Sequence, residues 1–544
     1  MGKRSHISNR QLKGVNRPIP VIDLFAGPGG LGEGFSSLYD ECGNRCFKIV
    51  LSIEKEQNAH QTLELRSFFR EFGSRIPEEY YSYIKGEITR EEFYSRYPAE
   101  AKAAALIAWH AELGSSSFPN ELIDQRICDA LDGSKNWILI GGPPCQAYSV
   151  IGRSRIRSSD PKKYEKYERD PRHFLYREYL RILAVHLPPV FIMENVQGIL
   201  STKIDGTSIF SSILSDLSNP HKYLSKQATS SGKPNNHINY RLYSLTQSLN
   251  DSIVNPSSFV VKMKHYGIPQ DRRRVIILGV RSDADATPNL LRKLKKVMTL
   301  KSVIGDLPKL RSGLSKVEDS SKNWRGTIKE IVKYTDGKLV GSSLKSKLIA
   351  YSKRALHTLP RGGQYIHYHG KPNYLPNWYK DERLAGVCNH HTKSHMMADI
   401  QRYFFASCFA ILENRSPLLK DFPDMLLPRH KNVREAIQNK NGLFSDRFRV
   451  QLWNCPATTI TSHIAKDGHY FIHPDPLQCR SLTVREAARL QTFPDNYFFE
   501  GNQTSQYQQV GNAVPPLLAR SIARIVYHVF LKMGNKKNQT KFEF

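Results

Sequence analysis

Trp137-Ile138-Leu139-Ile140, followed by Gly141-Gly142-Pro143-Pro144-Cys145-Gln146, is the stretch that decides the fold. A short apolar run between turn residues is typical of a buried parallel strand. In a parallel α/β sheet, ligands and chemistry lie beyond the carboxyl ends of the strands. Cys145 stands there on a turn stiffened by two prolines, which makes it a candidate nucleophile. Taken alone, the stretch also fits a buried structural cysteine on a βα turn.

A glycine-rich turn near the N-terminus predicts a nucleotide-type cofactor. Val21-Ile22-Asp23-Leu24-Phe25 is expected to be the first strand, and it runs into the spacing Gly27-x-Gly29-x-x-Gly32. Glycines in this pattern permit a tight turn and a close approach of the backbone to a ligand. The second expected strand, residues 49–53, ends at Glu54, where a carboxylate can accept hydrogen bonds from ribose hydroxyls. The pattern alone leaves NAD and S-adenosylmethionine open.

A second acid and a long insert follow. Asp129, within residues 126–130, is placed either to bind an adenine amino group or to begin a loop. Residues 58–117 are rich in charged and aromatic residues at helical spacing, which predicts a helical insert. Its expected packed faces carry Leu63, Leu65, Phe68, Phe69, Tyr80, Tyr81 and Tyr83. The sequence of the insert indicates no function.

Two further strands are expected to bring polar groups toward Cys145. The apolar run 190–193 ends at Glu194, so its carboxylate is expected in the same crevice. The run 275–280 follows a basic stretch that contains Arg272 and Arg274. Alternation along an extended chain puts these two arginines on one face. A basic run is usually a solvated face or a phosphate contact, but an Arg-x-Arg pair entering an apolar strand favours a site.

Composition narrows the class of protein. The chain has 544 residues, with 79 Lys and Arg against 50 Asp and Glu, and a formal net charge of +29. This length predicts at least two domains, and the basic surplus favours a nucleic-acid partner over an ordinary charged surface. The sequence lacks an apolar run of about 18 residues, so no membrane span is expected. Residues 1–20 lack the apolar region of a secretory signal, and the eight scattered cysteines suit a reducing cytoplasm.

The ordered motifs resemble the DNA (cytosine-5)-methyltransferase family. Phe25–Gly29, Pro144–Gln146, Glu194–Val196 and Gln270-x-Arg272-x-Arg274 stand in the order of that family, and residues 480–494 and 509–515 are similar to its last two motifs. The resemblance implies a doubly wound, Rossmann-like α/β sheet with a second, smaller target recognition domain. It also implies methylation of DNA, with S-adenosylmethionine as the methyl donor, in a bacterial restriction–modification system.

The resemblance implies a role for each candidate residue. Cys145 would add to C6 of a cytosine flipped out of the duplex, which makes C5 nucleophilic toward the methyl group. Glu194 would hold N3 and the exocyclic amine, and Arg272 and Arg274 would brace the base oxygen and the Cys145 loop. The implied cofactor contacts are Phe25, Gly27, Gly29, Glu54, Asp129, Pro144 and Asn512.

The loss of βα alternation after residue 280 predicts the domains. We expect a catalytic domain at residues 15–280, completed by residues 475–535, around a target recognition domain at 281–474. The expected partners are double-stranded DNA and a restriction endonuclease that acts on the same site. RNA as the substrate, a catalytically silent DNA-binding regulator and a nicotinamide oxidoreductase are the alternatives left open.

Two groups of cysteine and histidine are candidate zinc sites. They are Cys388-x-His390-His391 with His395, and Cys42 with Cys46. Neither has the second pair of ligands at the spacing of a structural zinc site. We therefore expect loop or packing roles for these residues, and no metal.

Overall fold

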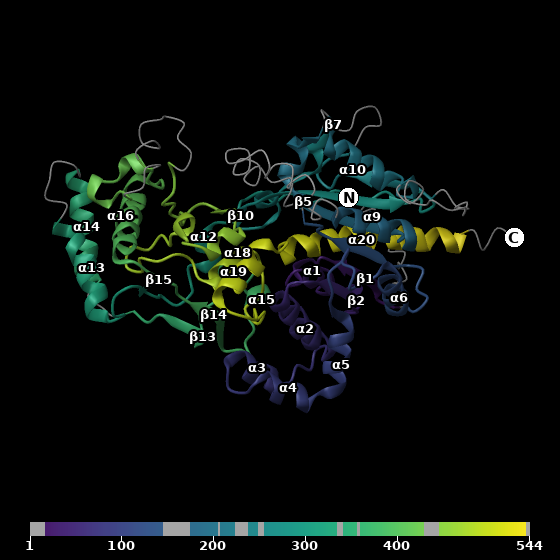
Figure 1. The fold of residues 1–544 in the computed structure, drawn as a ribbon, viewed down its shortest axis with the longest axis horizontal. Helices are drawn as coiled ribbons and strands as arrows, with labels where there is room; N and C mark the ends of the chain where they lie inside the picture. The colour runs from purple at the N-terminus through teal and green to yellow at the C-terminus, as the bar shows by residue number, and fades with distance from the viewer. Residues whose placement is uncertain are drawn as a thin grey trace, which may run out of the picture.

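The computed structural model describes residues 17–144, 175–204, 207–222, 238–248, 255–333, 341–355, 359–428, 433 and 445–539. Its central sheet has the strand order β3-β2-β1-β4-β5-β11-β8, and β9 also pairs with β11 (Figure 1). These strands are β1 (Ile19–Leu24), β2 (Phe47–Glu54), β3 (Ala108–His110), β4 (Ile138–Gly141), β5 (Val190–Val196), β8 (Tyr240–Tyr243), β9 (Val260–Lys262) and β11 (Arg273–Arg281). Cys145 lies outside the described residues, but the turn that leads to it is described as far as Pro144.

The sheet is doubly wound, as the sequence predicts. β1 pairs in parallel with β2 on one side and with β4 on the other, and β3 and β5 extend the parallel pairing. β11 runs antiparallel to β5. Because the strand order reverses between β1 and β4, a crevice opens beyond their carboxyl ends. The register pairs Leu24 with Gly141 and Gly141 with Met193, so β1, β4 and β5 end at one edge.

Helices cover both faces of the sheet, because its strands are apolar on both sides. Val21 and Ile138 belong to one core, whereas Ile22 and Leu139 belong to the core on the other face. Such continuous apolar runs are typical of strands buried between two layers. The first layer is α1 (Gly30–Ser36) and α20 (Pro516–Gln539), and the second contains α6 (Asn120–Leu131), α9 (Leu175–His186) and α10 (Ile209–Ser218).

Helix α20 returns from the C-terminal part of the chain to pack on α1 (Figure 1). A Cβ atom at Gly34 would lie 2.3 Å from Cβ of Ala519, and one at Gly30 would lie 2.2 Å from the carbonyl oxygen of Val514. Glycine at both positions therefore allows the two helices to meet. Among the described residues, one helical stretch, 503–534, is long and apolar enough to cross a membrane, yet 61% of its apolar window is buried inside the protein.

The segment predicted as a helical insert contains a strand. It begins with α2 (Gln57–Glu71), the crossover helix after β2, and continues through α3 (Glu78–Lys85), α4 (Arg90–Arg96) and α5 (Pro98–Ile107) into β3. The segment is therefore helical as far as Ile107, and the helical pattern missed β3, which has three residues and is too short to show alternation. The predicted packed faces are confirmed, because Leu65, Phe68 and Tyr80 are buried in one shared cluster.

The residues after β11 build a second body with several two-stranded sheets, on the left in Figure 1. Its apolar core lies among three helices, α13, α14 and α16. The elements are α12 (Leu300–Ile304), β12 (Gly313–Leu314), α13 (Ser321–Lys333), α14 (Ser342–Arg354), β13 (Gly362–His367), α15 (Pro376–Tyr379), β14 (Gly386–His391), β15 (Ser394–His395), α16 (Met397–Glu413) and β16 (Ala457–Thr458). The small elements β6 (Lys203–Ile204), β7 (Thr207–Ser208) and β10 (Gln270–Asp271) precede it, and α18 (Val484–Leu490) and α19 (Gln503–Asn512) follow.

One apolar core crosses the predicted boundary at residues 474/475. Leu300 and Val387, from before the boundary, share it with Ala487 of α18 and Val510 of α19. Helices α18 and α19 therefore pack between the large sheet and the second body, and both halves of the chain contribute to their burial.

Asp23 of β1 gives the fold a pH dependence that can be tested. The side chain is 1% exposed, and burial raises the pKa of its carboxyl to about 8. An acid whose pKa is raised by folding holds its proton more tightly in the folded state, so the free energy of unfolding falls as pH rises from about 4 to about 8. Asp23→Asn removes this titration.

We therefore expect the variant's stability relative to the wild type to increase with pH across this window, by up to about 1.4 kcal/mol per pH unit. Urea unfolding of both proteins at pH 5 and pH 8 measures the difference. A difference that is the same at both pH values would contradict the assignment.

Candidate active site

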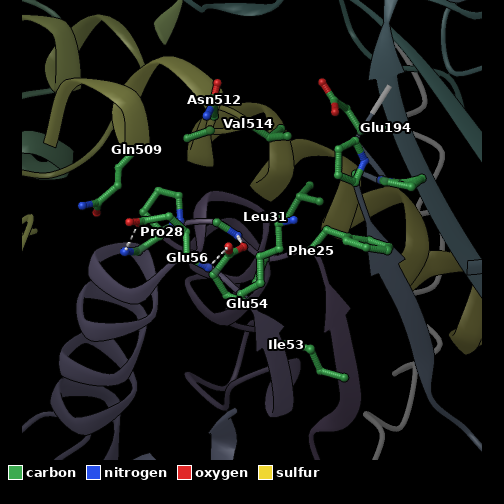
Figure 2. A pocket seen from close by; sticks show the side chains of 18 of the residues that line it. Phe25, Pro28, Leu31, Ile53, Glu54, Glu56, Glu194, Gln509, Asn512 and Val514 are labelled. Atoms are coloured by element: carbon green, nitrogen blue, oxygen red, sulfur yellow. Dashed lines mark hydrogen bonds between the residues drawn. The ribbon is translucent and has the colours of Figure 1, made fainter. Parts of the chain in front are cut away.

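A cavity of about 510 Å³ lies at the carboxyl ends of β1, β2, β4 and β5. Its walls are the glycine turn after β1, the end of β2, the turn after β4, the end of β5 and the segment from α19 to α20 (Figure 2). Its volume lies within the range of about 300–1,000 Å³ that small-molecule sites occupy. The structure brings seven of the predicted site residues to it, namely Phe25, Gly27, Glu54, Pro144, Glu194, Arg274 and Asn512.

The turn after β1 owes its shape to left-handed backbone at three positions. Phe25, Gly27 and Gly29 have φ values of 56°, 57° and 90°. A non-glycine residue in this conformation costs on the order of 1 kcal/mol or more, and such residues cluster at functional sites. A Cβ at Gly27 would have no neighbour within 4 Å, whereas one at Gly29 would lie 2.8 Å from Cδ1 of Leu63. Gly27 therefore leaves space at the cavity, while Gly29 allows close packing and does not line it.

Glu54 is held at the end of β2 by backbone donors. Its Oε2 accepts a hydrogen bond from the Gly27 N–H, and its Oε1 accepts one from the Glu56 N–H, both at 2.8 Å (Figure 2). Burial raises the pKa of this carboxyl above its usual value. A carboxylate has about four acceptor positions, so its oxygens can still accept from a ligand in the cavity. These acceptor positions fit an adenosine-type cofactor, whose ribose offers two hydroxyl donors.

Glu194 and Arg274 form a pair beside the turn that leads to Cys145. Nε of Arg274 lies 3.0 Å from Oε1 of Glu194, and both side chains are mostly buried. A Cβ at Gly142 would lie 3.0 Å from Oε2 of the same carboxylate. The side-chain amide of Asn195 donates to the carbonyl of Pro143 at 3.3 Å, which ties the end of β5 to this turn. The last described residues before Cys145 therefore lie against Glu194.

Arg272 does not line the cavity. Its guanidinium is fully buried and donates to the carbonyls of Ile460, at 2.6 Å, and Ala513, at 3.0 Å. Arg274 reaches the cavity and Glu194, whereas Arg272, between β10 and β11, is directed to these carbonyls and not into the cavity. Burial holds the pKa of Arg272 well below its usual value. Its contact with Ala513 positions the loop that carries Asn512.

The overall match with known sequences identifies the family. The model of the C-5 cytosine-specific DNA methylases matches residues 108–227 and 235–528. The chain belongs to this family. Its activity is therefore methyl transfer to C5 of cytosine in DNA, which excludes the oxidoreductase alternative and favours DNA over RNA. The family and the fold imply S-adenosylmethionine as the methyl donor.

Several curated relatives match this methylase over most of its length. The type II methyltransferase M.Bpa9945I of Bacillus paralicheniformis is 32% identical over 94% of this chain and 98% of its own. M.DdeI of Desulfomicrobium norvegicum, also a type II methyltransferase, is 24% identical over 94% of this chain and 89% of its own. Among solved structures, the Entamoeba histolytica methyltransferase EhMeth matches with a TM-score of 0.39 and 11% identity, over 94% of this chain and 99% of that one.

Asp129 of the methylase is not brought to the cavity. It lies on the exposed side of α6, where its Oδ1 accepts a hydrogen bond from the Gln125 side chain at 2.7 Å. Asp129 therefore neither lines the cavity, as an adenine contact would, nor begins a loop. The third strand is β3, much earlier in the chain, and Ala111 and Leu113 just after it line the cavity. Because β3 has only three residues, the sequence pattern did not indicate a strand here, and the residues after it were not predicted to line the cavity.

The side chains weighed as zinc ligands diverge in the methylase. The Cys388 thiol donates a hydrogen bond to the carbonyl of Ile84. The two ring nitrogens of His390 form hydrogen bonds with the Thr483 hydroxyl and with the carbonyl of Pro308. Cys42 is exposed and Cys46 is buried. The part of the chain that the structure describes contains no group of three or more His, Cys, Asp or Glu side chains able to hold a metal ion.

Sequence reasoning missed two buried glutamines behind the cavity wall. The Gln270 amide donates to Oε1 of Gln491 at 2.8 Å, and the Gln491 amide donates to the carbonyl of Val510 at 2.7 Å. Both side chains are fully buried, so these bonds are made without competition from water. Gln270 begins the Gln-x-Arg-x-Arg motif and Gln491 lies within residues 480–494, but the resemblance assigns a role to neither side chain.

Proposed function

We propose that this methylase modifies one cytosine within a specific duplex sequence, through a covalent adduct between Cys145 and C6 of a flipped base. The observation that carries the proposal is the Glu194–Arg274 pair, which lies against the Gly142 turn just before Cys145. The pair also borders the cavity that fits an adenosine-type cofactor. A base would have to leave the duplex to reach this crevice, since the target atom is inaccessible within the stack.

Each residue at the site has a chemical task in this proposal. The Cys145 thiolate forms a bond to C6 while Glu194 binds N3 and the exocyclic amine, which stabilises the negative charge that the addition places on the ring. Arg274 donates to one oxygen of Glu194 and so fixes the carboxylate for that contact. After methyl transfer, loss of the C5 proton and elimination of the thiolate restore the aromatic ring and free Cys145.

S-adenosylmethionine supplies the methyl group when it is bound. We assign its ribose hydroxyls to Glu54, its adenine to the ring of Phe25, and further contacts to Gly27, Pro144 and Asn512. The left-handed turn and the free acceptor positions of Glu54 support this assignment. Arg272 acts on the site as a positioning residue, through the backbone on either side of Asn512.

We also propose that the enzyme works in a restriction–modification system, with residues 281–474 as the part that reads the DNA sequence. Relatives that match nearly all of the chain are type II methyltransferases. A net charge of +29 provides for neutralisation of DNA phosphates. A restriction endonuclease that cuts the same sequence would be the partner enzyme.

Base-resolution methylation mapping tests the proposed function. Plasmid DNA is treated with purified protein and S-adenosylmethionine, beside a reaction that contains the Cys145→Ala variant. We expect 5-methylcytosine in one repeated sequence context with the wild type and none with the variant. Protein that binds the cofactor and leaves every cytosine unmodified, or that methylates tRNA instead, would overturn the proposal.

Glu54→Gln tests the cofactor assignment. The amide carries no charge and presents one oxygen, so it cannot accept from both backbone N–H groups and the ribose. Loss of charge-assisted hydrogen bonds costs about 1.5–3 kcal/mol, which predicts a dissociation constant for S-adenosylhomocysteine raised about 10-fold to 100-fold. Isothermal titration calorimetry measures it.

Glu112→Gln is the matched control. Glu112 is an exposed carboxylate just after β3 that pairs with Lys55. We expect its dissociation constant to stay within a factor of two of wild type. Equal affinities for the Glu54 variant and the control would contradict the role of Glu54.

A further inference from the structure

The helices α3, α4 and α5, here called the α3–α5 insert (residues 78–107), have no role in the site described above. Parallel neighbours such as β2 and β3 need one crossover helix, and α2 alone provides it. The insert carries six glutamates against four lysines and arginines, in a chain whose net charge is +29. An excess of negative charge does not attract DNA phosphates. The function of the insert is therefore inferred from the residues that it packs against.

The insert binds the loop that precedes β14 in the second body. The hydroxyl of Tyr81, which is 2% exposed, donates to Oδ2 of Asp381 at 2.8 Å. The Asn496 amide donates to the same oxygen at 2.7 Å, and the Arg383 N–H donates to Oδ1 at 3.0 Å. Asp381 thus accepts from three segments of the chain. The Arg383 guanidinium also reaches back to the insert, where it pairs with Glu78.

The insert also covers one side of the β13–β14 hairpin. Leu384 and Cys388 are fully buried in the same apolar cluster as Phe93 of the insert. The Cys388 thiol donates to the carbonyl of Ile84 at 3.4 Å, and the Lys85 ammonium lies 5.6 Å from the centre of the Tyr365 ring. Figure 1 shows α3 beside β13 at the lower edge of the molecule. The hairpin therefore has part of its core in the first half of the chain.

A chain of hydrogen bonds continues from the hairpin to the cofactor turn. Arg485 of α18 donates to the carbonyl of Cys388 at 2.7 Å and to that of Tyr497 at 2.7 Å. The Tyr497 hydroxyl donates to the carbonyl of Pro28, which lines the cavity. The insert binds the same segment, because the Tyr80 hydroxyl donates to the carbonyl of Asn496, next to Tyr497, at 2.8 Å. The hairpin is thus fixed relative to the glycine turn.

We infer that the α3–α5 insert positions the β13–β14 hairpin for sequence discrimination, with Asp381 as the central positioning residue. The inference rests on the proposed role of residues 281–474 in reading DNA. The insert holds the hairpin at a set place relative to the cavity, so that a cognate site bound by the second body presents its cytosine to Cys145. A displaced hairpin would bind cognate and near-cognate sequences more nearly alike.

The test compares two substitutions with a matched control. Tyr81→Phe and Asp381→Asn weaken the link between insert and hairpin without opening a cavity. Tyr97→Phe removes the same kind of bond inside the insert, where the Tyr97 hydroxyl donates to Glu79 at 2.8 Å. For each protein, single-turnover methylation is measured on the mapped cognate duplex and on duplexes that differ by one base pair. Melting temperature and affinity for S-adenosylhomocysteine are measured in parallel.

We expect the ratio of cognate to near-cognate rates to fall about 10-fold in Asp381→Asn and about 3-fold or more in Tyr81→Phe, the size of effect that loss of one hydrogen bond carries. The control keeps the wild-type ratio, and cofactor affinity stays within a factor of two throughout. A ratio does not depend on the fraction of active protein, so lower stability alone does not move it.

Two failures can be told apart. A wild-type protein that methylates no DNA, or methylates all contexts equally, would overturn the proposed recognition function and this inference with it. A wild type that discriminates, with variants that discriminate equally well, would overturn the inference alone, whatever their melting temperatures.

Discussion

Replacing Cys145 with alanine is expected to lower the single-turnover methylation rate by at least about four orders of magnitude, the scale on which loss of a covalent nucleophile acts. C5 of cytosine is a poor nucleophile, and in the proposed mechanism addition of the thiolate at C6 activates it. The proposed cofactor contacts come from other elements, chiefly the turn after β1 and the end of β2. The dissociation constant for S-adenosylhomocysteine is therefore expected to stay within a factor of two.

Cys128→Ala is the control for this variant. Cys128 is an exposed, free cysteine on α6, so its loss removes a thiol without touching the cavity. We expect wild-type rates from it. Trapping on duplex DNA that contains 5-fluorocytosine at the target provides a second readout, because the wild type and the control should form a stable adduct and Cys145→Ala should not. Methylation above a trace by Cys145→Ala would remove the cysteine from the mechanism.

Glu194→Gln is expected to slow the chemical step by about 10²-fold to 10⁴-fold, the range in which a general acid–base group contributes. The amide keeps the size of the side chain, but it cannot hold a proton for N3 and cannot balance the charge of Arg274, 3.0 Å away. Because this contact strengthens as the thiolate adds, kcat should fall far more than the KM for DNA changes.

Asp283→Asn is the control for the Glu194 variant. Asp283 pairs with Arg281 at the opposite end of β11, so the substitution removes another carboxylate–arginine pair from the same strand. Rapid-quench measurement of methyl transfer should leave this control near the wild-type rate. A Glu194→Gln variant that is as fast as the control would mean that the carboxylate serves only to hold Arg274.

The sequence predicts those parts of the site in which the local apolar pattern of a strand also fixes where the strand ends in the sheet. β1 and β4 are largely apolar because both of their faces are buried, and the groups just after them lie at the crevice by topology. Glu54 could be predicted for the same reason, since it ends the next strand. Glu194 and Arg274 lie on paired strands, and their contact follows from the register of β5 against β11.

The misses have physical causes as well. β3 contributes three residues at the edge of the sheet, too few for a periodic pattern, so the sequence favours Asp129, which lies in a helix. The Arg272 guanidinium donates to carbonyls in two loops that are distant from it in the sequence. Gln270 and Gln491 were missed for the same reason, because their partners exist only after the chain has folded.

The position of α20 has a consequence for the order in which the enzyme forms during synthesis. The turn after β1 is made early, but Asn512, Ala513 and Val514 on the opposite wall of the cavity leave the ribosome late. Until then, the sheet face that α20 covers is an exposed apolar surface on the nascent chain. A growing polypeptide thus carries Glu54 and Cys145 before it carries the opposite wall of the cavity. A chain that stops before Asn512 lacks that wall and leaves apolar surface uncovered, so we expect it to be inactive and prone to aggregate.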